Sequence, residues 1–291
     1  MKRELFFQYC KRKVNLLMLV LLTVIAVINY YGTYLDWSDL QRQVSNPSVD
    51  LNVDAVDNLL AGYSGLTYFA NLIFSSDFYV IIVVLMLMGF TAIVSEDMHQ
   101  SIRTGYGNMI VVRCNYKMYA REMIHAQSTY ICVVIWLFFT IQLVLLCVIW
   151  PVNWGGYITA NVSAHLTPFQ MLGYCGMHLG ILTVYMCLIF MITHTCTRFF
   201  KNKFALQALP LIIHFVPMLL AATLGNLTPL LAKIFSVVNT EAYLFTVKWV
   251  LTTDRPIGDI SLTTLGITGA FAIIASVLYR RSCIRYEGAF L

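Results

Sequence analysis

The sequence has little charge. Of its 291 residues only 11% are Asp, Glu, Lys or Arg, while 59% are hydrophobic. A soluble domain carries about 25% charged residues, so this chain cannot cover its surface with polar groups. Residues 123–197 contain no charged side chain, and neither do residues 204–232. A membrane helix needs about 20 apolar residues, so the first run predicts two spans and a loop, and the second predicts one span. The composition excludes a soluble enzyme and predicts an all-α polytopic membrane protein.

Sequence signatures of enzymes are also missing. No Gly is followed by Lys, which excludes a Gly-x-x-x-x-Gly-Lys phosphate loop, and neither His-Glu-x-x-His nor Gly-x-Ser-x-Gly occurs. The expected spans contain no Asp or Glu, the side chains that mark proton and sodium pathways, so an ion-coupled transporter is disfavoured. We therefore expect no enzymatic activity, no catalytic residue, no metal site and no cofactor in this chain.

The cysteines and the membrane histidines have simple interpretations. None of the eight cysteines falls in a segment expected outside and no two have Cys-x-x-Cys spacing, so we expect packing residues and no disulfides. His178, His194 and His214 are candidate metal or proton ligands. They lie on different spans or 16 residues apart without a carboxylate nearby, which favours helix-packing or lumen-facing polar groups over a ligand site.

The hydropathy pattern predicts six spans. Their ranges are about 14–34, 78–94, 129–150, 171–196, 205–224 and 260–279. The preceding segment, MKRELFFQYCKRK, predicts a short interfacial helix. In the fourth span Gly173, Gly176 and Gly180 are small residues, and the spacing of Gly176 and Gly180 predicts close helix approach. In the fifth, Pro210 and Pro217 predict a bend and are candidates for a gate.

The basic residues predict the orientation. With both termini in the cytoplasm, 15 of the 19 Lys and Arg residues lie on the cytoplasmic side. The apolar part of segment 225–259 contains Lys233, Glu241 and Lys248, each costing about 2.5–3.5 kcal/mol near a bilayer centre. We therefore expect this segment to re-enter the outer leaflet without crossing it. The chain is expected in the cell membrane, surrounded by lipid and without a nucleic-acid partner.

The most informative stretch is the cytoplasmic loop 95–128. Acidic residues at the membrane exit, including Glu96, are followed by a glycine break and then by charged and apolar positions at helical spacing. This pattern predicts two helices joined by a turn and pressed against the membrane, with charged groups facing the cytoplasm. The loop is long and amphipathic, which disfavours an ordinary solvated connector.

In this loop the chain resembles the permease subunits of the ABC-2 exporter family, especially the split Gram-positive type with a separate ATPase. The matching positions are Glu96, Gly105-Tyr106, Arg113 and Lys117-Met118-Tyr119, and the six-span topology extends the resemblance to the whole chain. The resemblance implies an ABC-2 (type V exporter-like) permease fold in a single domain, with loop 95–128 as a coupling helix that docks on an ATPase subunit. It also implies that two permeases, identical or paralogous, enclose the transport path.

Two functions stay open at this point. The first is a permease that exports an amphipathic substrate, such as a lipid, peptide or antimicrobial compound, with ATP bound by a partner subunit. The alternative is a non-transporting membrane sensor or scaffold. Its outer loop 35–77, which contains six Asp and one Arg, would bind a cationic ligand.

Overall fold

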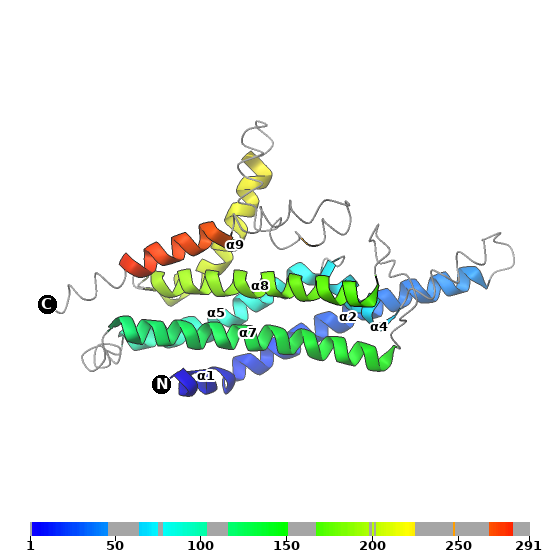
Figure 1. Cartoon of the computed structure of the whole chain (residues 1–291), viewed down its shortest axis with the longest axis horizontal. Coiled ribbons are helices and arrows are strands. Elements are labelled where there is room, and N and C mark those ends of the chain that lie inside the picture. Colours follow the sequence, from blue (N-terminus) through cyan, green and yellow to red (C-terminus); the bar gives the residue numbers. More distant parts are fainter. Residues whose placement is uncertain are drawn as a thin grey trace.

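The computed structural model describes residues 2–45, 64–74, 78–103, 116–150, 167–197, 200, 202–224, 247 and 268–281. Within these ranges the chain forms helices and no strand. The labelled helices are α1 (Lys2–Cys10), α2 (Lys13–Val44), α4 (Gly65–Phe74), α5 (Phe78–Arg103), α7 (Tyr116–Ile149), α8 (Pro168–Cys196) and α9 (Lys203–Leu224). Residues 268–281 are also helical and are called the last helix below, since they form the last helix of the described residues. The long helices lie against one another as a bundle, as Figure 1 shows.

Local signals in the sequence explain several helix starts. Thr167 caps α8: its hydroxyl accepts a hydrogen bond from the Gln170 backbone N–H at 3.4 Å, and the Gln170 side chain accepts from the Thr167 N–H at 2.9 Å. Pro168 follows at the first helical position, where its missing N–H costs nothing. In α9 the Asn202 side chain accepts from the Phe204 N–H at 3.0 Å.

Four described helices are long and apolar enough to cross a membrane. They cover Lys13–Gln43, Lys117–Ile149, Pro168–Cys196 and Lys203–Leu220. A fifth crossing is possible if Gly65–Phe74 and Phe78–Val94, which meet at an angle of 69°, form one bent span. These helices are compatible with a multi-pass membrane protein. Part of the predicted sixth span, 260–267, and the re-entrant segment 225–259, apart from residue 247, lie outside the described residues.

Three helices extend well beyond the predicted spans. Helix α2 continues ten residues past the predicted end at 34, α5 continues nine residues past 94, and α7 begins thirteen residues before 129. Hydropathy marks the part of a helix that lipid can surround, whereas backbone hydrogen bonding continues into polar sequence. The predicted ranges therefore located these helices correctly and underestimated their length.

Helix α4 lies within segment 35–77, which the sequence predicts as an outer loop. All its described residues are buried except the half-buried Asn71, and it contacts α2, α5, α7 and α8. The Tyr68 ring stacks on Trp150 with centroids 4.6 Å apart. The polar residues that made this segment a poor lipid-facing span are compatible with a protein interior: the Ser64 and Thr67 hydroxyls lie 3.1 Å apart, within hydrogen-bonding distance.

Close helix approach occurs at other glycines than those predicted. A Cβ atom added at Gly173, Gly176 or Gly180 would meet nothing within 4 Å, so the expectation of tight packing there is wrong for this chain by itself. At Gly65 the added atom would lie 2.5 Å from the Leu146 carbonyl oxygen, and at Gly89 it would overlap the Met18 side chain. Backbone proximity therefore ties α4 to α7.

Candidate functional site

The predicted coupling residues fall on and between two helix ends. The backbone of Glu96 is part of α5, while Lys117 and Tyr119 lie in the first turn of α7. Gly105, Tyr106 and Arg113 lie outside the described residues. Residues 95–103 and 116–128 are helical as continuations of α5 and α7, and segment 104–115, where the turn was predicted, lies outside the described residues.

Helix α1 supports this end of α7. The ring of Tyr9 packs on that of Tyr130 with centroids 5.6 Å apart, and the Tyr130 hydroxyl donates to the Asn15 side-chain oxygen at 2.9 Å. Burial raises the pKa of Tyr9 to about 12, an increase that the Gln127 side chain partly offsets. A buried aromatic contact thus holds α1 on α7, and a buried hydrogen bond joins the start of α2 to the same tyrosine of α7.

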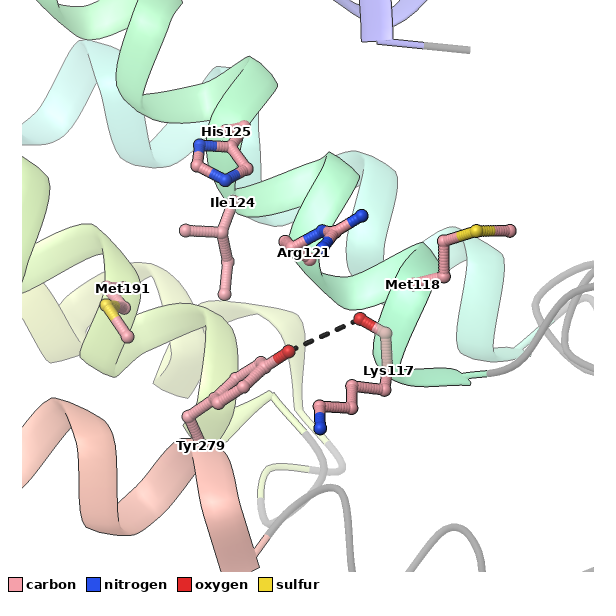
Figure 2. Close-up of a pocket in the computed structure, with 7 residues that line it drawn as sticks. All are labelled: Lys117, Met118, Arg121, Ile124, His125, Met191 and Tyr279. Atoms are coloured by element: carbon pink, nitrogen blue, oxygen red, sulfur yellow. Dashed lines mark hydrogen bonds between the residues drawn. The ribbon is translucent and has the colours of Figure 1, made fainter.

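A cavity of about 680 Å³ lies beside the start of α7. Its lining residues come from α7, α8 and the last helix: Lys117, Met118, Arg121, Ile124, His125, Met191 and Tyr279 (Figure 2). The Tyr279 hydroxyl donates to the Lys117 carbonyl oxygen at 3.3 Å, so the last helix contacts the start of α7. This contact also brings residue 279 to the same end of the bundle as α1.

The sequence analysis did not predict this cavity, although it named two of its lining residues, Lys117 and Met118, together with Tyr119. Lys117, Arg121 and His125 recur every four residues, a spacing that places them on one helical face and that could have been recognised from the sequence. The contribution of Tyr279 had no local signal, because it lies 162 residues away from Lys117.

The three membrane histidines bond to neighbouring helices. His178 Nε2 lies 2.6 Å from the Tyr79 hydroxyl, and His214 Nδ1 lies 2.8 Å from the Tyr185 hydroxyl. His194 Nδ1 lies 3.2 Å from the Gln127 side-chain oxygen. Each bond joins two helices, which confirms the interpretation as helix-packing groups. Within the described ranges, no group of three His, Cys, Asp or Glu side chains has the arrangement of a metal site.

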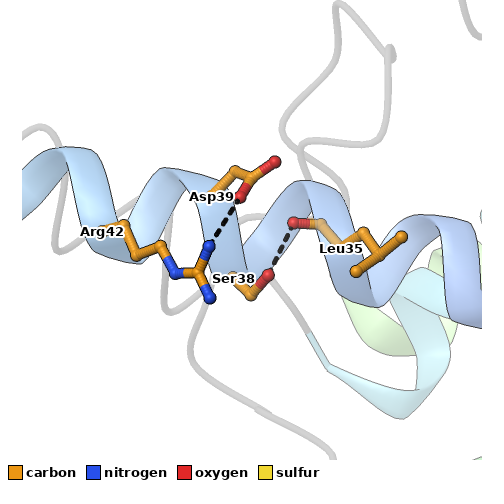
Figure 3. A network of polar contacts seen from close by, with 4 residues as sticks. All are labelled: Leu35, Ser38, Asp39 and Arg42. Carbon is orange, nitrogen blue, oxygen red and sulfur yellow. Dashed lines mark hydrogen bonds and ion pairs between the residues drawn. The ribbon is translucent and has the colours of Figure 1, made fainter.

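The predicted acidic surface is described only at its beginning. Asp36 and Asp39 are exposed residues of α2, and an Asp39 carboxylate oxygen lies 3.8 Å from the Arg42 guanidinium (Figure 3). An exposed pair of this kind contributes under about 1 kcal/mol. The other four acids of this segment, Asp50, Asp54, Asp57 and Asp77, lie outside the described residues.

The two candidate gate residues, Pro210 and Pro217, lie inside α9. Each proline removes one backbone hydrogen bond, and the second half of α9 turns away from the bundle (Figure 1). The bend predicted from the two prolines is therefore present, while a role in gating stays a prediction.

Comparison of the chain with protein-family models, with curated proteins and with solved structures finds no match.

Proposed function

We propose that this chain is the permease subunit of an ATP-driven exporter of the ABC-2 type, with ATP bound and hydrolysed by a separate subunit. It crosses the cell membrane six times with both termini in the cytoplasm. A second permease, identical or paralogous, completes the path for an amphipathic substrate such as a lipid, peptide or antimicrobial compound. The observation that carries the proposal is the pair of helix extensions at the ends of α5 and α7.

Helix length supports a coupling element outside the membrane. The 34 residues of α7 extend about 51 Å at a rise of 1.5 Å per residue, whereas the hydrocarbon core is about 30 Å thick. The charged residues of α7 lie near its start: Lys117, Arg121 and Glu122. The part of α7 that exceeds the hydrocarbon core, about 20 Å, is therefore assigned to that end. The charges of α5 likewise lie in its final turns, including Glu96 and Arg103. The two projecting helix ends would present segment 104–115 to a partner.

Contacts of α7 provide a route for transmission. Its first turn accepts a hydrogen bond from Tyr279 of the last helix, and Tyr130, fourteen residues after the start of α7, contacts α1 through Tyr9. A displacement of this end would therefore be felt at both ends of the chain. ATP-driven closure of the partner subunits would favour one of two packings of these helices.

The scaffold alternative has less support. Its ligand surface was the outer loop 35–77, of which 65–74 is a buried helix and 35–44 a continuation of α2. Asp39 is paired with Arg42, which leaves less unpaired negative charge for a cationic ligand.

Co-purification tests the proposal. From native membranes, the tagged chain should bring down a protein that hydrolyses ATP. If Arg113 binds a partner carboxylate in a buried contact, Arg113→Ala removes a pair whose loss costs about 3–5 kcal/mol, while an exposed contact is worth under about 1 kcal/mol. We expect Arg113→Ala to insert normally but to retain less ATPase. Arg198→Ala, the matched change in the connection between α8 and α9, should retain nearly all of it. Equal losses, or none in either variant, contradict the assignment of the coupling element.

A further inference from the structure

The cavity beside α7 combines positive charge with an apolar wall. Lys117, Arg121 and His125 are exposed and lie on one face of the helix. The remaining lining consists of Met118, Ile124, Met191 and Tyr279, and no carboxylate is among the described lining residues. This chemistry suits an anion that is attached to an apolar body.

We propose that this cavity binds the phosphate-bearing headgroup of an anionic membrane lipid. Its volume of about 680 Å³ lies within the range of about 300–1,000 Å³ that is usual for pockets filled by small organic molecules. A free phosphate ion would leave the apolar wall formed by Ile124, Met191 and Tyr279 without a partner. A lipid headgroup with the first part of its acyl chains contacts both kinds of surface.

The position along α7 agrees with this ligand. The cavity residues of α7 end at His125, and the predicted third span begins at about 129. The lining is thus at the level where cytoplasmic headgroups would meet the helix. Basic residues next to a membrane helix on the cytoplasmic side attract anionic lipids. Figure 2 shows Lys117 extending beside Tyr279, with Arg121 and His125 farther along the same helix.

Lipid titration of the purified full-length chain tests the site. Native mass spectrometry would follow bound phosphatidylglycerol, with phosphatidylcholine as the neutral comparison. Each basic side chain near a membrane surface contributes roughly fivefold in affinity. Lys117→Gln/Arg121→Gln should therefore weaken the tightest phosphatidylglycerol binding by roughly 25-fold. The control, Lys11→Gln/Lys13→Gln, removes the same charge from exposed residues outside the cavity and should change the affinity by less than about threefold.

Additional variants keep the result interpretable. Arg121→Lys preserves the charge and should stay within about threefold of the parent, while Arg121→Gln alone should lose roughly fivefold. If the double variant does not fold, the single change Arg121→Gln still tests the site. The cavity shares Lys117 with the predicted coupling residues, but the sample contains no ATPase, so lipid binding is measured independently of ATPase docking. Failure of this inference is therefore distinguishable from failure of the permease assignment.

Four outcomes would overturn the inference. Equal losses in the cavity and control pairs would indicate diffuse surface charge. Displacement of the lipid by millimolar inorganic phosphate would indicate a small-anion site. Equal affinity for phosphatidylcholine would indicate an apolar groove without headgroup recognition. If the cavity bound no lipid but did bind an acidic protein surface, the cavity would be assigned to a protein partner.

Discussion

Replacing Gly65 by Ala should separate α4 from α7. The new methyl group would lie 2.5 Å from the Leu146 carbonyl oxygen and 2.8 Å from that of Trp150. Both obstacles are backbone atoms, so they cannot rotate away, and α4 has to move. Overpacking of this kind costs about 1–3 kcal/mol. The stacked pair Tyr68 and Trp150 lies at the same junction and would be disturbed as well.

Gly180→Ala is the matched control with the opposite expected sign. A methyl group there meets nothing within 4 Å, and the residue lies in the interior of α8. Alanine in a helix interior is more favourable than glycine by about 0.8–1.0 kcal/mol. The control should therefore be as stable as the parent or more stable by up to about 1 kcal/mol. The two variants should differ by about 1–4 kcal/mol in the free energy of unfolding.

Reversible unfolding in mixed micelles, followed by circular dichroism, measures this difference. We expect the midpoint of Gly65→Ala at a lower denaturant fraction than the parent and that of Gly180→Ala at the same or a higher fraction. A Gly65→Ala protein as stable as the parent would refute the close contact between α4 and α7. A Gly180→Ala protein that loses as much as Gly65→Ala would show that α8 is tightly packed at a glycine that the structure leaves open.

Three further predictions concern polar contacts and topology. Tyr79→Phe removes the hydroxyl 2.6 Å from His178 Nε2 and should lower the free energy of unfolding by about 0.6–1.7 kcal/mol. Tyr31→Phe, at an exposed tyrosine, should change it little, and equal effects of the two changes would contradict the interhelical bond. Burial raises the pKa of Tyr9 to about 12, so the folded state holds the phenol proton more tightly than the unfolded chain does. The free energy of unfolding should therefore fall as pH rises from about 10 to 12. A Tyr9→Phe protein that shows the same loss would exclude Tyr9 as its cause. In a cysteine-free background, single cysteines at 45, 160 and 255 should react with an external reagent and those at 100, 200 and 285 should not; external labelling at 285 would mean that segment 225–259 crosses the membrane.

Helix positions were largely predictable from the sequence because charge and hydropathy mark where lipid ends. The predicted fourth span, 171–196, compares with Pro168–Cys196, and the fifth, 205–224, with Lys203–Leu224. The extension of α2 was missed because a helix in water needs no apolar side chains, whereas helical structure before 129 was expected from the residue spacing in loop 95–128. The burial of α4 was missed because the segment was evaluated as a surface for lipid, while its contacts are with protein.

The candidate site was predictable only in part. The charged start of α7 was recognised from spacing, whereas the cavity also needs Met191 and Tyr279, which only the tertiary fold brings to it. The same limit applies to the histidines: their lack of carboxylate partners excluded a simple ligand site. The choice of Tyr79 and Tyr185 as partners depends on helix packing.

Photocrosslinking at the coupling element tests the permease assignment most directly. One variant of the chain, made in the cell, has a photoreactive amino acid in place of Tyr106. A control variant has it in place of Arg42, near the end of α2 on the predicted outer side. We predict that position 106 forms an adduct with a chain containing a Gly-x-x-x-x-Gly-Lys phosphate loop, and that position 42 does not. No such adduct at 106, or the same adduct at both positions, would contradict docking of an ATPase on this loop.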